Sequence, residues 1–363
     1  MRAALLTAPG QDLTVGNVDT PSTLRGDEVR VRTSAVGLCH SDLHVVDGLV
    51  QRPMPIVLGH EAAGVVTEIG VDVTGIRPGD HVVACFVVSC GACRMCVSGR
   101  PAMCQDREAT MRGESEEPRL SIDGAEVHQW TSIAGYAEEM VLHHSAVTVI
   151  DDRMPLDLAA LLGCAVATGV GSATTVAGIG PGDHIAVIGC GGVGLNVCQG
   201  AALAGATSII AIDRSDARLE LARTRFGATH TVNSDREPDV AALVSSWTGG
   251  GVDHAFEAVG IPALVGTALD LTVRGGTVWA VGVFGDTAEI TVPAGHLHAG
   301  KGVHGVRAGS IVPSRDIPLL VDAYLEGRLE LEALVGRRIP LDRINDGIAD
   351  LRAGTGARTL VVF

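Results

Sequence analysis

The sequence predicts a mixed α/β protein: a mainly β part, followed by a parallel sheet built from βαβ units. Up to about residue 160, short runs that alternate with period two or end at Gly and Pro are typical of strands. From about Leu156, buried-strand patterns alternate with segments of helical length, which is the order that builds a parallel sheet. The chain has 363 residues, enough for two domains, and its many Gly and Ala with few aromatic residues suit close helix–sheet packing.

The first part contains short strands separated by turns. The stretch "DEVRVRTSAVG" (27–37) alternates at period two, and "HEAAGVVTEIG" (60–70) is an apolar run bounded by Gly, so each predicts a strand. A Pro-Gly turn in "IRPGDHV" (76–82) lies between such runs. The polar stretch "MRGESEEPRL" (111–120) predicts an exposed loop.

The second part alternates strands with helices. The run "HIAVIG" (184–189) predicts a buried strand, and the segment 191–206 that follows it has helical length and small residues. The stretch "DARLELARTRFGA" predicts a helix that begins at Asp216 and ends at Gly227. Further strands are expected at 208–213, 251–260, 275–282 and 357–363, and two further helices near 316–326 and 343–353.

Composition and charge exclude several classes of protein. The net charge of −15 leaves no basic face to replace the counterions of a nucleic acid, so no nucleic-acid partner is expected. No run of about eighteen apolar residues predicts a membrane span, and "MRAALLTAPG" (1–10) is too short for a secretory signal. We therefore expect a cytoplasmic protein with no membrane partner. In a reducing compartment, nine cysteines indicate metal ligands and buried apolar side chains rather than disulfides.

A dinucleotide site is predicted by "GCGGVG" (189–194), which fits G-x-G-x-x-G with Gly189, Gly191 and Gly194. Alone, this motif is a weak signal in a chain with 47 glycines. Here it follows a strand and opens a helix, so that its backbone N–H groups, with those of Gly192 and Val193, would face a pyrophosphate. The alternative is that these glycines only permit close packing.

The acidic residue that accompanies this motif is Asp213, which ends the next strand nineteen residues after Gly194. Its carboxylate would accept hydrogen bonds from the adenosine ribose and repel a 2′-phosphate, so it favours NAD over NADP. The adjacent Arg214 weakens this preference, because a guanidinium could meet a 2′-phosphate.

Four cysteines with the spacing C-x2-C-x2-C-x7-C predict a structural Zn²⁺ site: Cys90, Cys93, Cys96 and Cys104. Four thiolates complete a tetrahedral zinc site and leave no position for substrate, so the cluster would cross-link a loop. The alternative is an iron–sulfur cluster, whose run continues x3-C-P; here seven residues intervene and no proline follows.

A second constellation is dispersed along the chain. It comprises Cys39, His40, Ser41 and His44 in "GLCHSDLH", His60 and Glu61 in "LGHEAAG", and Cys164 in "LLGCAVATG". Two cysteines and one histidine form a three-ligand set that leaves a fourth position of zinc open to water or an alcohol. Taken alone, Cys164 in its apolar segment has the pattern of a core residue, and Ser41 has that of a helix N-cap.

Over its whole length, the chain resembles the zinc-dependent alcohol dehydrogenases of the medium-chain dehydrogenase/reductase superfamily. "GHEAAGVVTEIG" (59–70) is similar to the zinc signature of that family, and the four-cysteine lobe and "GCGGVG" follow in the expected order. "LRAGTGARTLVVF" (351–363) resembles the C-terminus of the family.

The resemblance implies two domains. Residues 1–165 and 308–363 would form a GroES-like, mainly β catalytic domain, and residues 166–307 a Rossmann domain with a doubly wound parallel sheet, with the active site in the cleft between them. Relatives pair through edge strands of the nucleotide domain, so the resemblance implies a homodimer, with a tetramer as the alternative.

The resemblance also implies the role of each site residue. Cys39, His60 and Cys164 would ligate catalytic zinc, giving two Zn²⁺ per chain, with Glu61 able to approach the metal and Asp42 orienting His60. A proton would leave the alcohol through Ser41 and reach solvent from His44. The remaining residues would bind NAD: His40 and Arg358 at the pyrophosphate, Arg218 at the ribose, and Thr168, Val281, Val306 and Ala308 around the nicotinamide.

The expected reaction is hydride transfer between a primary or aromatic alcohol and NAD, with the aldehyde as substrate in reverse. Phe86 and Trp130 fall where the family lines its alcohol pocket. The alternatives are an aldehyde or enal reductase of a biosynthetic pathway, a thiol-dependent formaldehyde dehydrogenase, and a non-catalytic zinc or iron–sulfur protein.

Overall fold

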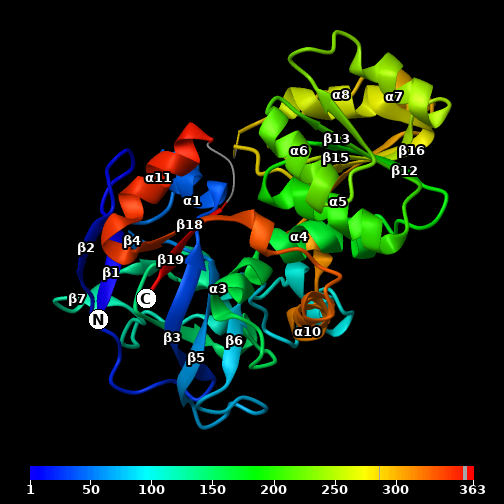
Figure 1. Ribbon diagram of the computed structural model, residues 1–363. Helices are drawn as coiled ribbons and strands as arrows, with labels where there is room; N and C mark the ends of the chain where they lie inside the picture. Colours follow the sequence, from blue (N-terminus) through cyan, green and yellow to red (C-terminus); the bar gives the residue numbers. More distant parts are fainter. Residues whose placement is uncertain (286, 355–357) are drawn as a thin grey trace. The chain divides into compact units, whose positions relative to one another are not determined.

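The computed structural model describes residues 1–285, 287–354 and 358–363 (Figure 1). The chain divides into two compact units. One, which we call the split unit, comprises Met1–Cys164 with Ile311–Phe363, and the other, the central unit, comprises Ala165–Ser310. The predicted divisions lie at 165/166 and 307/308, within three residues of these, and Ala165 and the segment 308–310 lie with the central unit.

The split unit is mainly β. The predicted strands 27–37 and 60–70 are β3 (Glu28–Gly37) and β5 (Glu61–Ile69), which pair antiparallel along most of their length. In β3 the side chains alternate between buried and more exposed from Val29 to Ala35, as period-two patterning requires. The larger sheet has the order β11 (Val147–Val149), β6 (His81–Ala84), β5, β3, β19 (Arg358–Val362) and β18 (Val335–Pro340), with β10 (Glu139–His143) also on β3.

Smaller sheets complete this unit. One has the order β2 (Thr14–Asn17), β1 (Arg2–Leu6), β4 (Ile56–Val57) and β9 (His128–Gln129), and β7 (Ser121–Ile122) pairs with β8 (Ala125–Glu126). The helices are α1 (His40–Val46), α2 (Arg94–Val97), α3 (Leu156–Ala159), α10 (Pro313–Leu325) and α11 (Ile344–Ala353). Short helical turns are η1 (Pro101–Met103), η2 (Glu108–Thr110), η3 (Trp130–Ser132), η4 (His144–Ala146), η5 (Ala160–Gly163), η8 (Glu332–Leu334) and η9 (Leu341–Arg343).

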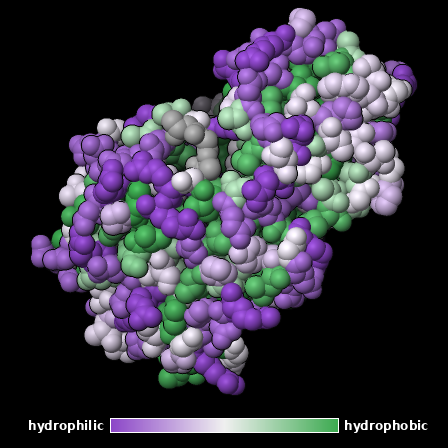
Figure 2. Space-filling model, in the orientation of Figure 1, coloured by the Kyte–Doolittle hydropathy of each residue, from purple (hydrophilic) through white to green (hydrophobic). Residues whose placement is uncertain are grey.

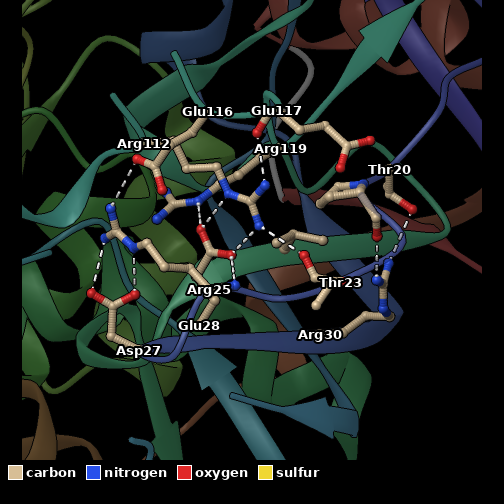
Figure 3. Close-up of polar contacts among 12 residues, drawn as sticks. Thr20, Thr23, Arg25, Asp27, Glu28, Arg30, Arg112, Glu116, Glu117 and Arg119 are labelled. Atoms are coloured by element: carbon tan, nitrogen blue, oxygen red, sulfur yellow. Dashed lines mark hydrogen bonds and ion pairs between the residues drawn. The ribbon is translucent and has the colours of Figure 1, made fainter. Parts of the chain in front are cut away.

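A buried carboxylate anchors the polar stretch 111–120, which the sequence predicts as an exposed loop. Most of this stretch is exposed, but Arg119 is 6% exposed and its Nε donates to Oε1 of the fully buried Glu28 at 2.7 Å. Arg112 Nε donates to the same oxygen at 3.0 Å (Figure 3). Burial alone would raise the pKa of Glu28, but the two guanidinium groups outweigh it and lower this pKa to about 2. The loop is therefore fixed to β3 by two arginines.

The central unit contains a parallel sheet in which each described strand runs parallel to its neighbours. Its order is β14 (His230–Asn233), β13 (Ser208–Asp213), β12 (His184–Ile188), β15 (Val252–Glu257), β16 (Thr272–Ala280) and β17 (Gly302–Gly305). In chain order this is 3-2-1-4-5-6, the doubly wound Rossmann order, which confirms the predicted fold class. The helices are α4 (Ala165–Gly171), α5 (Gly192–Ala204), α6 (Asp216–Arg225), α7 (Val240–Thr248), α8 (Pro262–Leu271) and α9 (Ala294–His298), with a π-helical turn η6 (Ser172–Val176) and a short turn η7 (Ala308–Ser310).

Local sequence signals explain the ends of these elements. α6 begins at Asp216 as predicted, because the Ser215 side chain accepts from the backbone N–H of Arg218 and caps the helix. It ends at Arg225, two residues before Gly227, whose φ of 79° only Gly adopts without strain. β16 begins at Thr272, three residues before the predicted strand 275–282.

Within the described residues, no single helix is long and apolar enough to span a membrane, although the consecutive helices Leu156–Gly163 and Ala165–Val176 pass that test when combined. Figure 2 shows hydrophilic and hydrophobic residues mixed over the visible face, as most folded surfaces are.

Candidate active site

Four potential metal ligands converge in the split unit. Cys39, His60, Glu61 and Cys164 each offer one ligand atom, these atoms all lie within 4.8 Å of one another, and all four residues are buried. Cys39 caps the N-terminus of α1, His60 immediately precedes β5, and Cys164 follows η5. The pairing of β3 with β5 thus brings residues from distant parts of the sequence together.

Asp42 fixes the orientation of the His60 ring. It is fully buried, and its Oδ1 accepts a hydrogen bond from His60 Nδ1 at 3.0 Å. Its Oδ2 accepts from the backbone N–H of Cys39 at 3.1 Å and from the hydroxyl of Tyr136 at 2.9 Å. Because Nδ1 donates to this carboxylate, Nε2 is the nitrogen that is free to bind a metal. This is the role that the resemblance implied for Asp42.

The ionisable groups among these ligands interact strongly with one another. Burial acts to lower the pKa of His60, but the carboxylate of Asp42 and the sulfur of Cys39 raise this pKa by more than burial lowers it. The pKa of His60 therefore lies well above its usual value. A hydrogen bond from Cys164 and the charge of Arg358 hold the pKa of Cys39 well below that of a free thiol, against the effect of burial. A thiolate, a second sulfur and an imidazole nitrogen form the donor set that zinc prefers, and three such ligands leave one position open. The residues present therefore fit a catalytic zinc ion.

Arg358 contacts this group of ligands, a relationship that the sequence analysis missed. Its Nη2 lies 3.0 Å from Glu61 Oε1 and 3.8 Å from Cys39 Sγ, and its Nη1 donates to the Leu38 carbonyl at 2.8 Å. Burial raises the pKa of Glu61 to about 8, even though the charge of Arg358 opposes this effect. Glu61 is thus engaged by a guanidinium in this structure, while the contact of Arg358 with a pyrophosphate stays a prediction.

Two aromatic rings stand edge-on to His60. The ring centroids of Phe86 and His60 are 5.7 Å apart, and those of Trp130 and His60 are 6.4 Å apart, both T-shaped. These are the two residues expected to line the alcohol site. Large apolar side chains beside this histidine exclude water.

Ser41 lies against the ligands, whereas His44 does not contact it. The hydroxyl of Ser41 is 3.2 Å from His60 Nε2 and 3.3 Å from Cys39 Sγ. The N-cap of α1 is Cys39, so the alternative that Ser41 caps the helix is wrong. His44 lies in the last turn of α1, and no hydrogen bond joins it to Ser41, both residues being within the described range.

The four cysteines at 90–104 form a second cluster in the split unit. Their sulfur atoms all lie within 4.8 Å of one another and none forms a disulfide: Cys90, Cys93, Cys96 and Cys104. Backbone N–H groups of Gln105 and Cys96 lower the pKa of Cys93 to about 6, as suits a thiolate ligand. Four sulfurs without another donor fit a structural zinc ion.

The glycine motif forms the turn between β12 and α5 in the central unit. Gly189 has φ 95°, and a Cβ at that position would lie 2.5 Å from a methyl group of Val259. A Cβ at Gly194 would collide with the carbonyl oxygen of Gly189. Gly191 caps α5, which begins at Gly192, so backbone N–H groups are exposed at a helix N-terminus.

Asp213 ends β13 beside this turn and has a second role that the sequence did not show. Its Oδ2 accepts from the backbone N–H of Cys190 at 2.7 Å, and its Oδ1 accepts from Ser215 N–H at 2.9 Å. Arg218 Nη1 lies 3.8 Å from Oδ2. The carboxylate thus braces the glycine turn from the next strand. The exposed Arg214 forms an ion pair with Asp235, with Nε–Oδ1 at 2.8 Å.

The other predicted cofactor residues are divided between the units. Val281 and Val306 follow the carboxyl ends of β16 and β17, the same edge of the sheet as the glycine turn. Thr168 lies in α4 and Ala308 in η7, also in the central unit. His40 and Arg358 belong to the split unit, in α1 and β19. Ligands bind at the carboxyl edge of such sheets, so a dinucleotide site at this edge stays a prediction that the positions of these residues are compatible with.

The chain is similar to known dehydrogenases over its whole length. The family model described as alcohol dehydrogenase GroES-like domain matches residues 25–152, and that described as zinc-binding dehydrogenase matches residues 192–326. An NDMA-dependent alcohol dehydrogenase of Amycolatopsis methanolica is 36% identical over 99% of this chain and 98% of the relative. An S-(hydroxymethyl)glutathione dehydrogenase of Escherichia coli is 34% identical over 100% of this chain and 99% of the relative.

Solved structures agree. The benzyl alcohol dehydrogenase of Acinetobacter calcoaceticus is 31% identical, with a TM-score of 0.93 over 100% of this chain and 99% of that structure. The GroES-like unit, the Rossmann sheet and the two donor sets together define a zinc-type dehydrogenase. The chain belongs to the zinc-dependent alcohol dehydrogenases of the medium-chain dehydrogenase superfamily. Membership implies an oxidoreductase that uses zinc and a nicotinamide coenzyme, NAD or NADP.

Proposed function

We propose that this protein oxidises primary or aromatic alcohols with NAD and reduces the corresponding aldehydes in reverse. The observation that supports this best is the convergence of Cys39, His60 and Cys164 within 4.8 Å in a buried place, oriented by Asp42. A three-ligand set is what a metal that also binds substrate requires.

The metal would be held by Cys39, His60 and Cys164, and when bound it supplies a Lewis acid that lowers the pKa of an alcohol hydroxyl. Asp42 keeps His60 in the tautomer whose Nε2 faces the ligands. The hydroxyl of Ser41, which lies beside Cys39 and His60, would accept the alcohol proton and donate its own in turn, and His44, which forms no hydrogen bond with Ser41 within the described residues, would release a proton to solvent through an intervening group. A second zinc ion, held by the cysteines at 90–104, stabilises their loop.

The coenzyme would bind at the carboxyl edge of the Rossmann sheet, with the pyrophosphate at the turn 189–194. Asp213 supports NAD as the coenzyme, because its carboxylate would repel a 2′-phosphate. Arg214, which could accept that phosphate, is already paired with Asp235.

Two features support an aromatic alcohol as substrate. Phe86 and Trp130 stand beside His60 and would contact an apolar ring. The similar structure named benzyl alcohol dehydrogenase acts, by its name, on such a substrate.

A thiol-dependent formaldehyde dehydrogenase is the second candidate, favoured by the similarity to an S-(hydroxymethyl)glutathione dehydrogenase. An aldehyde reductase, a homodimeric or tetrameric assembly and a cytoplasmic location also stay proposals.

The test is a substrate panel with zinc-loaded protein. Alcohols with NAD or NADP, aldehydes with NADH, and formaldehyde with and without glutathione are compared by absorbance of the reduced nicotinamide. We expect benzyl alcohol with NAD to be oxidised without thiol.

The Ser41→Ala variant should lose most turnover with unchanged zinc content, and His44→Gln should mainly steepen the pH dependence of turnover. Turnover that requires glutathione, or no redox exchange with any compound, would contradict the proposal.

A further inference from the structure

Trp130 carries a hydrogen-bond donor that has no partner beside the candidate metal ligands. The side chain is 8% exposed, and its ring centroid lies 6.4 Å from that of His60. Within the residues that the structure describes, no atom accepts a hydrogen bond from Trp130 Nε1, and the buried hydroxyl of Thr131 also has no partner. Buried polar groups are nearly always satisfied, so these two require a further acceptor or donor.

An arginine covers the same ring. The guanidinium carbon of Arg52 lies 5.2 Å from the centroid of Trp130, over its face. Arg52 is exposed, and its Nη1 donates to the carbonyl of the preceding residue, Gln51, at 2.6 Å. Across the described ranges no carboxylate forms an ion pair with Arg52, whereas Arg30 and Arg338, for example, each have one. A guanidinium stacked on an indole keeps its N–H edges available to an anion.

The backbone holds this pair in place. β4 and β9 run parallel, with Ile56 opposite His128, so that the segment after Arg52 and the segment before Trp130 lie side by side. The turn that follows Trp130 is strained: Thr131, Ser132 and Ala134 have φ of 53°, 65° and 62°, values that non-glycine residues rarely adopt. Such strain collects at functional sites, where the surrounding structure enforces one conformation.

We propose that Arg52 and the indole N–H of Trp130 select alcohols and aldehydes that carry a carboxylate at the end away from the carbinol. A ring-carboxylated benzyl alcohol fits this description: its hydroxymethyl group would reach the metal ligands, its ring would lie along Trp130, and its carboxylate would meet the guanidinium of Arg52 and the indole N–H of Trp130. This inference rests on the proposed alcohol oxidation and names its substrate class.

The overall charge of the protein does not oppose this selection. A net charge of −15 repels anions at long range. Salt screens such repulsion beyond about 8 Å at physiological ionic strength, so the guanidinium that contacts the anion decides the local interaction.

The experiment compares para-(hydroxymethyl)benzoate with its neutral amide and with benzyl alcohol in the zinc-loaded enzyme with NAD. We expect wild type to have a higher kcat/KM for the carboxylate than for the amide, and added NaCl to reduce this preference. Arg52→Gln should lower kcat/KM for the carboxylate about tenfold and leave that for benzyl alcohol nearly unchanged. Arg52→Lys should retain part of the preference, and Trp130→Phe, which keeps the ring but loses the N–H, should reduce it.

A matched control is Arg77→Gln, which removes another exposed positive charge and should leave the ratio unchanged. Binding of para-(hydroxymethyl)benzoate to the holoenzyme by equilibrium dialysis gives a readout independent of turnover and should weaken in Arg52→Gln. Equal losses on all three substrates, or a ratio that Arg52→Gln does not change, would overturn this inference alone. No oxidation of any of the three alcohols by wild type would instead overturn the proposed function, and the inference with it.

Discussion

Arg358 and Glu61 form a buried ion pair, with Arg358 Nη2 3.0 Å from Glu61 Oε1. Arg358 is 8% exposed and Glu61 is fully buried. The strand that carries Arg358, β19, is antiparallel to β3, which leads directly into Cys39. The C-terminal strand therefore places a positive charge beside the buried Glu61 and Cys39 at the candidate metal site.

The first prediction concerns this pair. Because the pKa of Glu61 is about 8, this carboxyl ionises beside the guanidinium only at higher pH, so we expect Arg358→Met to lower the free energy of unfolding little through this pair at neutral pH and progressively more above pH 8. The double variant Arg358→Met with Glu61→Gln should recover part of this loss, because no unpaired charge remains. Urea unfolding measures the free energy of unfolding of the single and of the double variant. Arg153→Met, which breaks an exposed ion pair with Asp151, is the control and should change the stability little. A loss in the double variant as large as in the single one would refute the ion-pair explanation.

The second prediction concerns the orientation of His60. In Asp42→Asn an amide replaces the carboxylate that accepts from His60 Nδ1, so the imidazole becomes a weaker and less fixed ligand. We expect metal affinity at the catalytic position to fall about 10- to 100-fold, measured by competition with a chelator. Asp47→Asn, at the exposed end of α1, should retain the affinity of wild type. Equal metal retention in both variants would show that Asp42 does not support the ligand.

The third prediction concerns coenzyme preference. Asp213→Ala removes the carboxylate that would bind the ribose and that braces the Cys190 N–H, so the dissociation constant for NADH should rise and the discrimination against NADPH should shrink. Arg214→Gln should change the dissociation constants for NADH and NADPH little, because Arg214 is held by Asp235 on the surface. Fluorescence titrations with NADH and NADPH compare the variants. A marked loss of NADPH binding in Arg214→Gln would mean instead that Arg214 reads the 2′-phosphate.

The fourth prediction concerns acid stability. The pKa of Glu28 in the folded protein is about 2, below its usual 4.5, because Arg112 and Arg119 outweigh the effect of burial. A lowered folded pKa stabilises the protein fully above pH 4.5, and this contribution is lost as the pH falls towards 2. We expect Glu28→Gln to lower the stability at neutral pH by about 3 kcal/mol and to flatten its decline in that acid range.

The control for this prediction is Glu68→Gln, which removes a largely exposed carboxylate that pairs with Arg30. Denaturant midpoints at several pH values should show little difference between this variant and wild type. An unaltered acid decline in Glu28→Gln would contradict the assignment.

Local patterns account for what the sequence predicted well. Period-two alternation gave β3, and Gly-bounded apolar runs gave β5 and β12, because these signals depend on neighbours in the chain. The turn 189–194 was foreseen from its glycines, since close backbone approach there admits no Cβ at Gly194.

Contacts between distant segments were not foreseen. Glu61 and Arg358 are separated by most of the chain, and only the pairing of β3 with both β5 and β19 brings them together. The contact of Arg52 with Trp130 likewise depends on the pairing of β4 with β9. The interpretation of Ser41 as an N-cap failed because the helix begins two residues earlier than that cap would require, with Cys39 in the extended conformation of a cap.

Anomalous diffraction at the zinc absorption edge, from crystals of zinc-loaded protein, tests the central claim most directly. The account predicts two peaks per chain, one among Cys39, His60 and Cys164 and one among the four cysteines at 90–104. A peak at the four cysteines alone, with none at Cys39, His60 and Cys164, would contradict it.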